Sequence, residues 1–337
     1  MAQISMLILD ILRKYSDENH TMNQTDILNK LRTEYDHKHD RKSIRRNIED
    51  LLGMGYPIEY TVKPRKNGND VWTDFWYARD FTEPELRLLI DGLLFSKHVP
   101  YKQCQQLVEK LEGLSSEHFK AHVKHIKTLP DSEIYNTQIF HTIAVLDEAI
   151  SQNKQVAFRY VYYGIDKKPH PKLDEDGTPH EYIINPYQMA AREDKYYLIC
   201  NLDGKDNIAN YRIDRITDIR MLDTKRRPFT QLKDSYGNSL NLGEYMKHHI
   251  YMFAGDNARV RFRAVKAMIS DIIDIFGKDV IIEEESDTHI IVTVRVNEAA
   301  IIRFAQSFAP DVVILDPPEL ANKMKDWAKK VKKAYEQ

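Results

Sequence analysis

The chain has 337 residues, a formal net charge of −2 at pH 7, and a composition that is 42% hydrophobic and 30% charged. This length predicts two or three domains, and this composition excludes a disordered or fibrous protein. Because no run of about eighteen apolar residues occurs, we expect no membrane-spanning helix. The N-terminal segment lacks a small-residue cleavage site, so no signal peptide is expected. Cys104 and Cys200 lie outside any CxxC motif, which predicts a cytoplasmic protein with buried, unpaired cysteines.

Apolar residues recur at helical spacing three times near the start of the chain. Residues 4–12 predict a first helix, 22–31 a second, and 41–54 a third. Asp40 can cap the third helix, because its side-chain oxygen can accept a hydrogen bond from a free backbone N–H.

The third predicted helix carries basic residues opposite its apolar stripe. Lys42 and Arg46 point almost directly away from the buried side, with Ser43 and Arg45 beside them. Basic side chains at a helix N-terminus oppose the helix dipole, so they do not serve helix stability. Arginine on a helix in the major groove can bind guanine with two hydrogen bonds. A solvated charged face is the alternative, and the helix alone does not decide between them.

Two strands are predicted after this helix, at residues 57–62 and 71–77, with a basic turn that contains Asn67-Gly68 between them. Three helices followed by a hairpin with a basic tip predict a winged helix-turn-helix over residues 1–80. We expect it to bind double-stranded DNA, with the hairpin tip contacting phosphates. The predicted DNA-binding residues are Arg41, Lys42, Ser43, Arg45, Arg46, Lys63, Arg65 and Lys66.

Residues 81–136 are predicted to form a helical connector. Thr82 and Glu85 have the spacing of a capping box. His118, His122 and His125 share one side of a predicted helix, at a spacing that could hold a metal ion. Because no Asp, Glu or Cys completes a set with them, we predict a solvated face, no metal site and no cofactor.

Strand patterns begin after a predicted helix at residues 137–151. The predicted strands are residues 155–163, 181–187, 195–200 and 208–220. Short strands at this spacing predict a small β-barrel over residues 137–225. The polar insertion 164–180 is predicted to be a mobile loop, and residues 226–257 a linker.

From residue 258 onward the predicted order is strand, helix, strand, strand, helix, strand, helix. The first six elements follow the βαββαβ order of ferredoxin-like domains, so we predict such an α/β domain over residues 258–337. The whole chain is therefore predicted to be an α+β multidomain protein.

The residues also resemble a known family, both within the predicted DNA-binding region and further along the chain. Residues 40–59 are similar to the recognition helix and wing entry of WYL-domain transcription regulators. That family commonly has Arg-Asp where this chain has Arg46-Asn47. Residues 315–320 resemble the C-terminal extension that often follows the WYL domain.

Three motifs follow the WYL domain itself in order and spacing. They are Asn185-Pro186-Tyr187, residues 195–198, and residues 210–216, with Tyr196 in place of the usual Trp. An aromatic residue at this position preserves the packing role. The resemblance therefore implies that the predicted barrel is an Sm/SH3-like WYL domain.

The family places polar and basic residues of this barrel around a site for an effector, a nucleotide or a single-stranded nucleic acid. Arginine offers a planar fork for phosphate, and tyrosine offers a stacking face. The resemblance carries over Tyr187, Tyr197, Arg212 and Arg215, with Arg192 added from the segment between two motifs. The alternative is structural: Arg212 can pair with Asp214 or Asp218, and tyrosines can belong to the core.

No nucleotide-binding, zinc-protease or serine-hydrolase motif occurs, so we predict no enzyme activity. We predict a bacterial DNA-binding regulator, a repressor or an activator, whose DNA binding responds to an effector. A homodimer is expected, because such regulators commonly read palindromic half-sites. The resemblance also suggests an operon linked to phage defence. The alternative is a nucleic-acid-processing enzyme or an accessory ligand-binding subunit of a phage-defence system.

Overall fold

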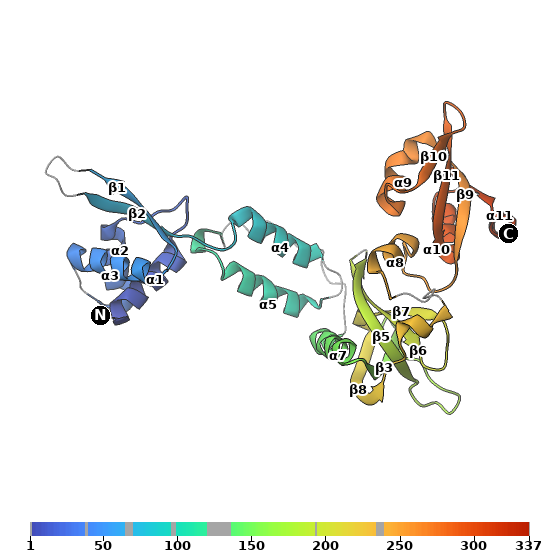
Figure 1. The fold of residues 1–337 in the computed structure, drawn as a ribbon, viewed down its shortest axis with the longest axis horizontal. Coiled ribbons are helices and arrows are strands. Elements are labelled where there is room, and N and C mark those ends of the chain that lie inside the picture. Colours follow the sequence, from blue (N-terminus) through green and yellow to red (C-terminus); the bar gives the residue numbers. More distant parts are fainter. Residues whose placement is uncertain are drawn as a thin grey trace. The chain divides into compact units, whose positions relative to one another are not determined.

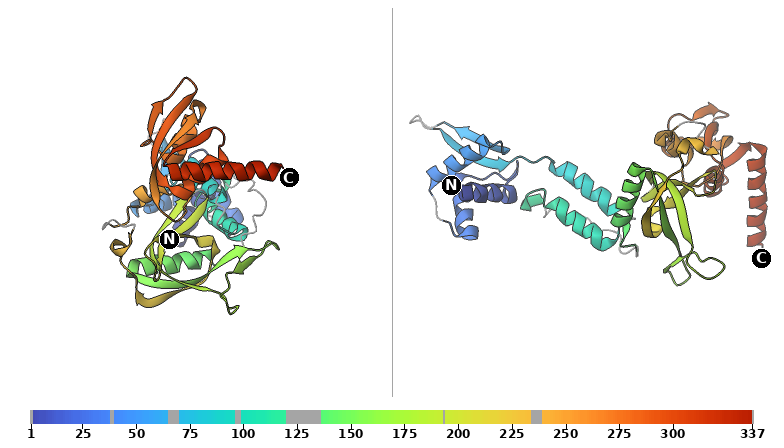
Figure 2. Two further views of the ribbon diagram at one scale, coloured as in Figure 1. Left: turned by 90° about the vertical axis from the view of Figure 1, so that its right-hand side faces the viewer. Right: turned by 60° about the horizontal axis from the view of Figure 1, so that its bottom comes forward.

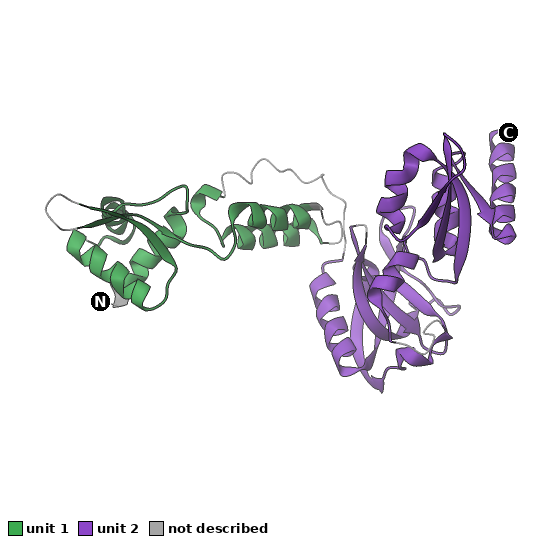
Figure 3. Ribbon diagram, turned by 45° about the horizontal axis from the view of Figure 1, so that its top comes forward, with its two compact units in different colours: residues 1–134 green, residues 135–337 purple. Residues whose placement is uncertain are grey.

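The computed structural model describes residues 2–37, 40–64, 70–95, 99–119, 136–192, 194–233 and 239–336. The chain divides into two compact units, Met1–Ile134 and Tyr135–Gln337 (Figure 3). Helices and several separate sheets make up these units, so the predicted α+β multidomain class is confirmed. Within the described ranges, no helix is both long enough and apolar enough to cross a membrane.

Three helices open the first unit, and they share one apolar core. They are α1 (Ala2–Tyr15), α2 (Gln24–Tyr35) and α3 (Arg41–Gly53). Ile8, Ile27 and Ile44, one from each helix, are fully buried in this core. The Asp40 carboxylate accepts a hydrogen bond from the backbone N–H of Ser43 at 2.7 Å, which confirms the predicted cap.

A hairpin follows these helices, formed by antiparallel β1 (Ile58–Lys63) and β2 (Val71–Tyr77) (Figure 1). Phe75 of β2 is fully buried against the helices. The backbones of Met22 and Phe75 exchange two hydrogen bonds of 2.8 Å. The segment between α1 and α2 therefore extends the hairpin by a short bridge, which the sequence did not predict.

The rest of the first unit is helical, with α4 (Glu83–Phe95), α5 (Tyr101–Glu112) and a short helical stretch at residues 117–119. The backbone N–H of Thr82 donates to a Glu85 carboxylate oxygen at 2.9 Å, as the capping box predicts. Leu86 and Ile90 of α4 bury Phe119, which anchors the stretch 117–119 on this helix pair.

The second unit begins with α7 and a six-stranded antiparallel sheet. Its elements are α7 (Ile139–Gln152), β3 (Lys154–Tyr163), β4 (Pro169–Pro171), β5 (Glu181–Arg192), β6 (Lys195–Leu202), β7 (Ile208–Arg212) and β8 (Ile216–Lys225). The strands pair in the order β4-β3-β5-β6-β7, and β8 pairs with β3. Helix α7 covers this sheet, and its Leu146 is fully buried with Phe158, Ile184 and Leu198.

Three predictions for this sheet need correction. No ladder joins β7 to β8 among the described residues, so the sheet is not a closed barrel. The predicted strand 208–220 is two strands separated by a 3₁₀ turn, η1 (Ile213–Arg215). The first, β7, pairs with β6, and the second, β8, pairs with β3. The insertion 164–180 is not simply a loop, because its β4 pairs with the end of β3 and Leu173 bridges to Pro179.

The segment predicted as a linker contains η2 (Phe229–Gln231) and the short helix α8 (Leu242–His248). Leu232 and Tyr245 of this segment are buried with Tyr187 and Ile199 of the preceding sheet. The described parts of this segment therefore pack on the sheet instead of only connecting two domains.

The C-terminal part is a second sheet covered by helices. Its elements are β9 (Asn257–Val265), α9 (Ile269–Phe276), β10 (Ile281–Glu284), β11 (His289–Asn297), α10 (Glu298–Ser307), β12 (Val312–Asp316) and α11 (Pro318–Tyr335). The first six occur in the predicted βαββαβ order, and the strands pair in the order β10-β11-β9-β12. Phe262, Phe276 and Phe304 meet in its core. Helix α11, the red helix in Figure 2, contacts β12 and α10.

Candidate nucleic-acid interface and effector site

The outer face of α3 presents basic side chains to solvent. Arg41, Lys42 and Arg46 are exposed, and Ser43 and Arg45 are half-buried. The opposite face is buried in the helical core, so the helix cannot turn these side chains inward without exposing that core. Within the described residues, Lys42 and Arg46 have no hydrogen-bond or ion-pair partner. Neither cation has to break a contact with another described residue to bind an anionic ligand.

Weak contacts position the other two arginines of α3. Arg45 donates to the Glu49 carboxylate at 2.9 Å, and its guanidinium lies 4.8 Å from the centre of the Trp72 ring of β2. Arg41 donates to the Thr25 hydroxyl of α2 at 3.0 Å. Exposed contacts of this kind contribute at most about 1 kcal/mol, so a stronger partner such as phosphate can replace them.

The predicted wing residues are described only in part. Lys63, at the end of β1, forms an ion pair with Asp74 at 2.9 Å, and its side chain is 62% exposed. The hydrogen bond from Lys63 holds the pKa of Asp74 below its usual value. Arg65 and Lys66 lie outside the described residues.

Asn47, which stands where the resembling family commonly has Asp, lies on the buried side of α3. Its side chain is buried and accepts a hydrogen bond from the Ser5 hydroxyl of α1 at 2.7 Å. It also donates to the Ser43 carbonyl oxygen at 2.7 Å. This side chain therefore connects α3 to α1.

In the second unit, two predicted effector residues hold the structure together. Tyr187 is 8% exposed and donates to the carbonyl oxygen of Arg227 at 3.0 Å; burial raises its pKa to about 12. Arg192 donates to the carbonyl oxygens of Ile250 at 3.2 Å and Ile275 at 3.5 Å. Both side chains direct their hydrogen bonds to distant backbone, which indicates a structural role.

Arg212 and Tyr197 lie opposite each other on β7 and β6. The Arg212 guanidinium donates two hydrogen bonds to Asp214, at 3.0 and 2.6 Å, and the Asp214 side chain is only 7% exposed. The alternative in which Arg212 pairs with Asp214 is therefore the arrangement that the structure shows.

Arg215 differs from Arg212, although the two lie close in sequence. Its Nε atom is buried and has no hydrogen-bond partner among the described residues. Its guanidinium lies 5.9 Å from the centre of the exposed Tyr163 ring. Because buried donors in native proteins nearly always have a partner, this unsatisfied N–H is exceptional, and a ligand can complete it only if neighbouring groups move to uncover it.

A cavity of about 760 Å³ lies elsewhere in the second unit, and the sequence did not predict it. Residues from well-separated segments line it, among them Ile208 of β7, Phe229 of η2, Tyr245 of α8 and Arg295 of β11. This size is within the usual range for small-molecule sites. No hydrophobic period or motif reports such a cavity, because its walls come together only in the folded chain.

The cavity combines stacking surfaces with polar groups. The rings of Tyr245 and His249 stack with their centres 3.9 Å apart, and both residues line the cavity. Burial, with Arg295 nearby, lowers the pKa of His248, so at neutral pH this imidazole is mainly neutral. Tyr187 and Tyr197 belong to the apolar cluster beneath the cavity, but none of the predicted effector residues lines it.

Two domain families match the second unit. The WYL domain matches residues 141–221, and the WCX domain matches residues 255–332. The chain carries a WYL domain and a WCX domain. The open sheet and Arg212–Arg215 lie within or at the edge of the WYL match. Of the residues that line the cavity, Ile208 lies in the WYL match and Arg295 in the WCX match, and Phe229 and Tyr245 lie in the segment between the two.

Solved structures similar to the chain include two with low TM-scores. One is proteasome accessory factor B/C (PafBC) of Arthrobacter aurescens, with 13% identity and a TM-score of 0.28 over 99% of this chain and 49% of that chain. The chain thus spans about half the length of the PafBC chain. The other is a CRISPR Cas-related protein, with 16% identity and a TM-score of 0.37 over 99% of this chain and 84% of that chain. No curated protein matches the chain.

Proposed function

We propose that the chain is a transcription regulator whose residues 1–80 form a winged helix-turn-helix that binds double-stranded DNA. The observation that carries the proposal is the exposed basic face of α3, where Lys42 and Arg46 lack partners among the described residues. An α-helix fits the major groove, and its N-terminal residues there reach base edges. The hairpin next to α3 supports the proposal, because Lys63 can contact phosphate at the cost of one exposed ion pair.

The second unit supplies the regulatory half of the proposal. WYL and WCX domains fit a regulator or a defence-associated protein. We propose that this unit binds an effector, a nucleotide or a single-stranded nucleic acid, and that binding changes the affinity for DNA. The Arg215 guanidinium beside the Tyr163 ring supports a phosphate contact, since arginine binds phosphate oxygens through paired N–H donors; the buried Nε would take part once neighbouring groups move to uncover it. A homodimer remains part of this proposal.

Replacing Lys63 with alanine is expected to weaken binding to every duplex by a similar factor. If Lys63 contacts one phosphate, the slope of log K against log salt concentration should become shallower by about 0.9. Fluorescence anisotropy with a random-sequence duplex, titrated at several salt concentrations, measures both quantities. Lys330→Ala on exposed α11 is the matched control and should leave the slope unchanged. If the wild type shows no salt-dependent binding, or instead cleaves the duplex when Mg²⁺ is added, the regulator proposal is wrong.

Arg215→Ala is expected to abolish the response of the chain to a short single-stranded oligonucleotide. The probe is a deoxyoligonucleotide of about ten nucleotides, a length typical of single-strand sites. It should raise the Tm of the wild type, because a ligand that binds only the folded state stabilises it. Arg220→Ala, an exposed arginine of β8, is the control and should respond like the wild type. An undiminished Tm shift in Arg215→Ala would place the effector elsewhere, with the 760 Å³ cavity as the next position to test.

Arg212 is unsuited to this test. Its removal would leave the buried Asp214 carboxylate without its partner. Breaking one side of a buried ion pair costs about 3–5 kcal/mol, so a lost response could reflect unfolding and not lost binding.

A further inference from the structure

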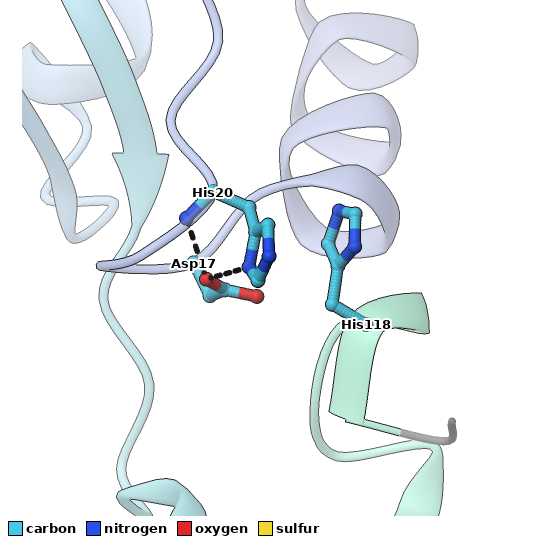
Figure 4. Close-up of side chains that lie close together, drawn as sticks. All are labelled: Asp17, His20 and His118. Carbon is cyan, nitrogen blue, oxygen red and sulfur yellow. Dashed lines mark hydrogen bonds and ion pairs between the residues drawn. The ribbon is translucent and has the colours of Figure 1, made fainter. Parts of the chain in front are cut away.

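A group of three side chains in the first unit combines metal-binding chemistry with distant positions in the sequence. Asp17 and His20 lie in the turn between α1 and α2, and His118 lies in the helical stretch 117–119 (Figure 4). The possible ligand atoms of the three residues all lie within 4.8 Å of one another. Sequence spacing pointed to His118 with His122 and His125, of which the last two lie outside the described residues.

Asp17 holds the imidazole of His20 in a defined orientation. The Asp17 Oδ1 atom lies 2.8 Å from Nδ1 of His20, and it also accepts hydrogen bonds from the backbone N–H groups of Asn19 at 3.0 Å and His20 at 2.8 Å. Its Oδ2 atom accepts a hydrogen bond of 2.6 Å from the buried Ser116 hydroxyl. Burial raises the pKa of Asp17, but the hydrogen bonds from Ser116 and His20 outweigh it and leave the pKa below its usual value.

The hydrogen bond to Asp17 determines which ring nitrogen of His20 is available to bind a metal ion. A carboxylate that accepts from Nδ1–H leaves the lone pair on Nε2, and histidines that bind metals usually have such a partner on their other nitrogen. The His20 side chain is 45% exposed, so an ion can approach it from solvent. The carboxylate oxygens of Asp17 already accept four hydrogen bonds. Asp17 is therefore better suited to orient the metal-binding imidazole of His20 than to bind the metal ion itself.

The second imidazole lies directly beside the first. The rings of His20 and His118 are stacked, with their centres 3.8 Å apart and their planes 9° apart. Neither ring nitrogen of His118 has a hydrogen-bond partner in the described part of the chain. Its neighbours Ser116 and Phe119 are both buried, which holds the backbone of His118 in place.

We propose that His20 and His118 bind a divalent transition-metal ion such as Zn²⁺, with Asp17 as the positioning residue and water in the remaining coordination positions. Two nitrogens on a tetrahedral zinc ion lie about 3.3 Å apart at the usual Zn–N distance of about 2.0–2.1 Å. Parallel rings do not aim their lone pairs at one point, so one ring must turn about its Cβ–Cγ bond. This torsion is broad and costs little. A bound ion would connect the turn after α1 to the stretch that follows α5.

Titration calorimetry of the full-length, tag-free and EDTA-treated chain with Zn²⁺ alone tests this proposal. One ion per chain should bind in a step that His20→Ala and His118→Ala each remove. Asp17→Asn should weaken the same step by about 10- to 100-fold, the usual effect of removing the partner of a ligand histidine. His180→Ala is the matched control, because His180 also pairs with a carboxylate, that of Asp174 at 2.6 Å, but belongs to no described group of three possible ligands.

A second measurement keeps the test independent of the variants. In a histidine side-chain NMR spectrum of the wild type, Zn²⁺ should shift the ring signals of His20 and His118 and leave those of His180 in place. The proposal is overturned if the wild type binds no ion, if both histidine variants bind it as the wild type does, or if neither ring signal moves. Metal binding does not depend on the proposed DNA binding, so either proposal can fail without the other.

Discussion

Replacing Arg46 with alanine is expected to weaken binding to the preferred duplex by about 1–3 kcal/mol, a factor of about 5 to 150. Arg46 is exposed on α3 and has no partner among the described residues, so its removal should not disturb the fold. The loss should be smaller for random-sequence DNA, because a base contact contributes only to the preferred site. Anisotropy titrations of both duplexes, at one fixed salt concentration, measure the difference.

Arg303→Ala provides the matched control for Arg46. Arg303 is an exposed arginine of α10 in the other unit, and its removal changes the net charge by the same amount. We expect the Arg303→Ala variant to bind both duplexes with the same affinity as the wild type. If Arg46→Ala reduced the affinity for the preferred and the random duplex by the same factor, Arg46 would contact phosphate and read no base.

Asn185→Ala is expected to destabilise the second unit by about 3–5 kcal/mol, because it removes the centre of a buried polar network. Asn185 is fully buried. Its side-chain oxygen accepts from Gln155 at 3.1 Å and from the backbone N–H of Arg227 at 2.8 Å, and its amide donates to Asn201 at 3.0 Å. Alanine would leave these partners buried and unsatisfied, and each such group costs about 1–3 kcal/mol.

Differential scanning calorimetry of the full chain measures this effect. The unfolding transition of the second unit should move to a lower temperature, and that of the first unit should stay in place. Gln152→Ala, an exposed substitution at the end of α7, should change stability by no more than about 0.5 kcal/mol. A transition that is unchanged in Asn185→Ala would contradict a structural role for the Asn185-Pro186-Tyr187 motif.

Sequence periodicity predicted the local elements well, because burial of one face leaves a pattern in consecutive residues. The apolar stripe of α3, its Asp40 cap and the hairpin β1–β2 all followed from such patterns. The βαββαβ order of the C-terminal part followed in the same way. These features depend on neighbours within a few positions of each other.

Features that depend on distant residues were not predictable in this way. The bridge between Met22 and Phe75 involves a single residue on each side and leaves no period. The turn Ile213–Arg215 interrupts a segment whose sequence reads as one continuous strand. Sequence periodicity did not reveal it, because a short 3₁₀ turn does not visibly alter the strand pattern. Periodicity reports that a side chain is buried but not which partner it meets.

The candidate sites show the same limit. The basic residues of α3 could be placed on one helix face from sequence alone, and the structure exposes Arg41, Lys42 and Arg46 there and leaves Arg45 half-buried. The predicted effector residues differ in their contacts: Tyr187 and Arg192 bind backbone and Arg212 pairs with Asp214, whereas Arg215 keeps an unsatisfied donor. Sequence similarity places residues in order along the chain, but hydrogen bonding decides which of them remain available to a ligand.

Selection of bound duplexes from a random-sequence library by the wild-type chain tests the central claim most directly. We predict enrichment of one sequence motif, arranged as two inverted half-sites whose centres lie about one helical turn or a multiple of it apart. The same selection with Arg46→Ala should lose base preference within each half-site. A library that remains random after repeated selection with the wild type would contradict the claim that α3 reads DNA.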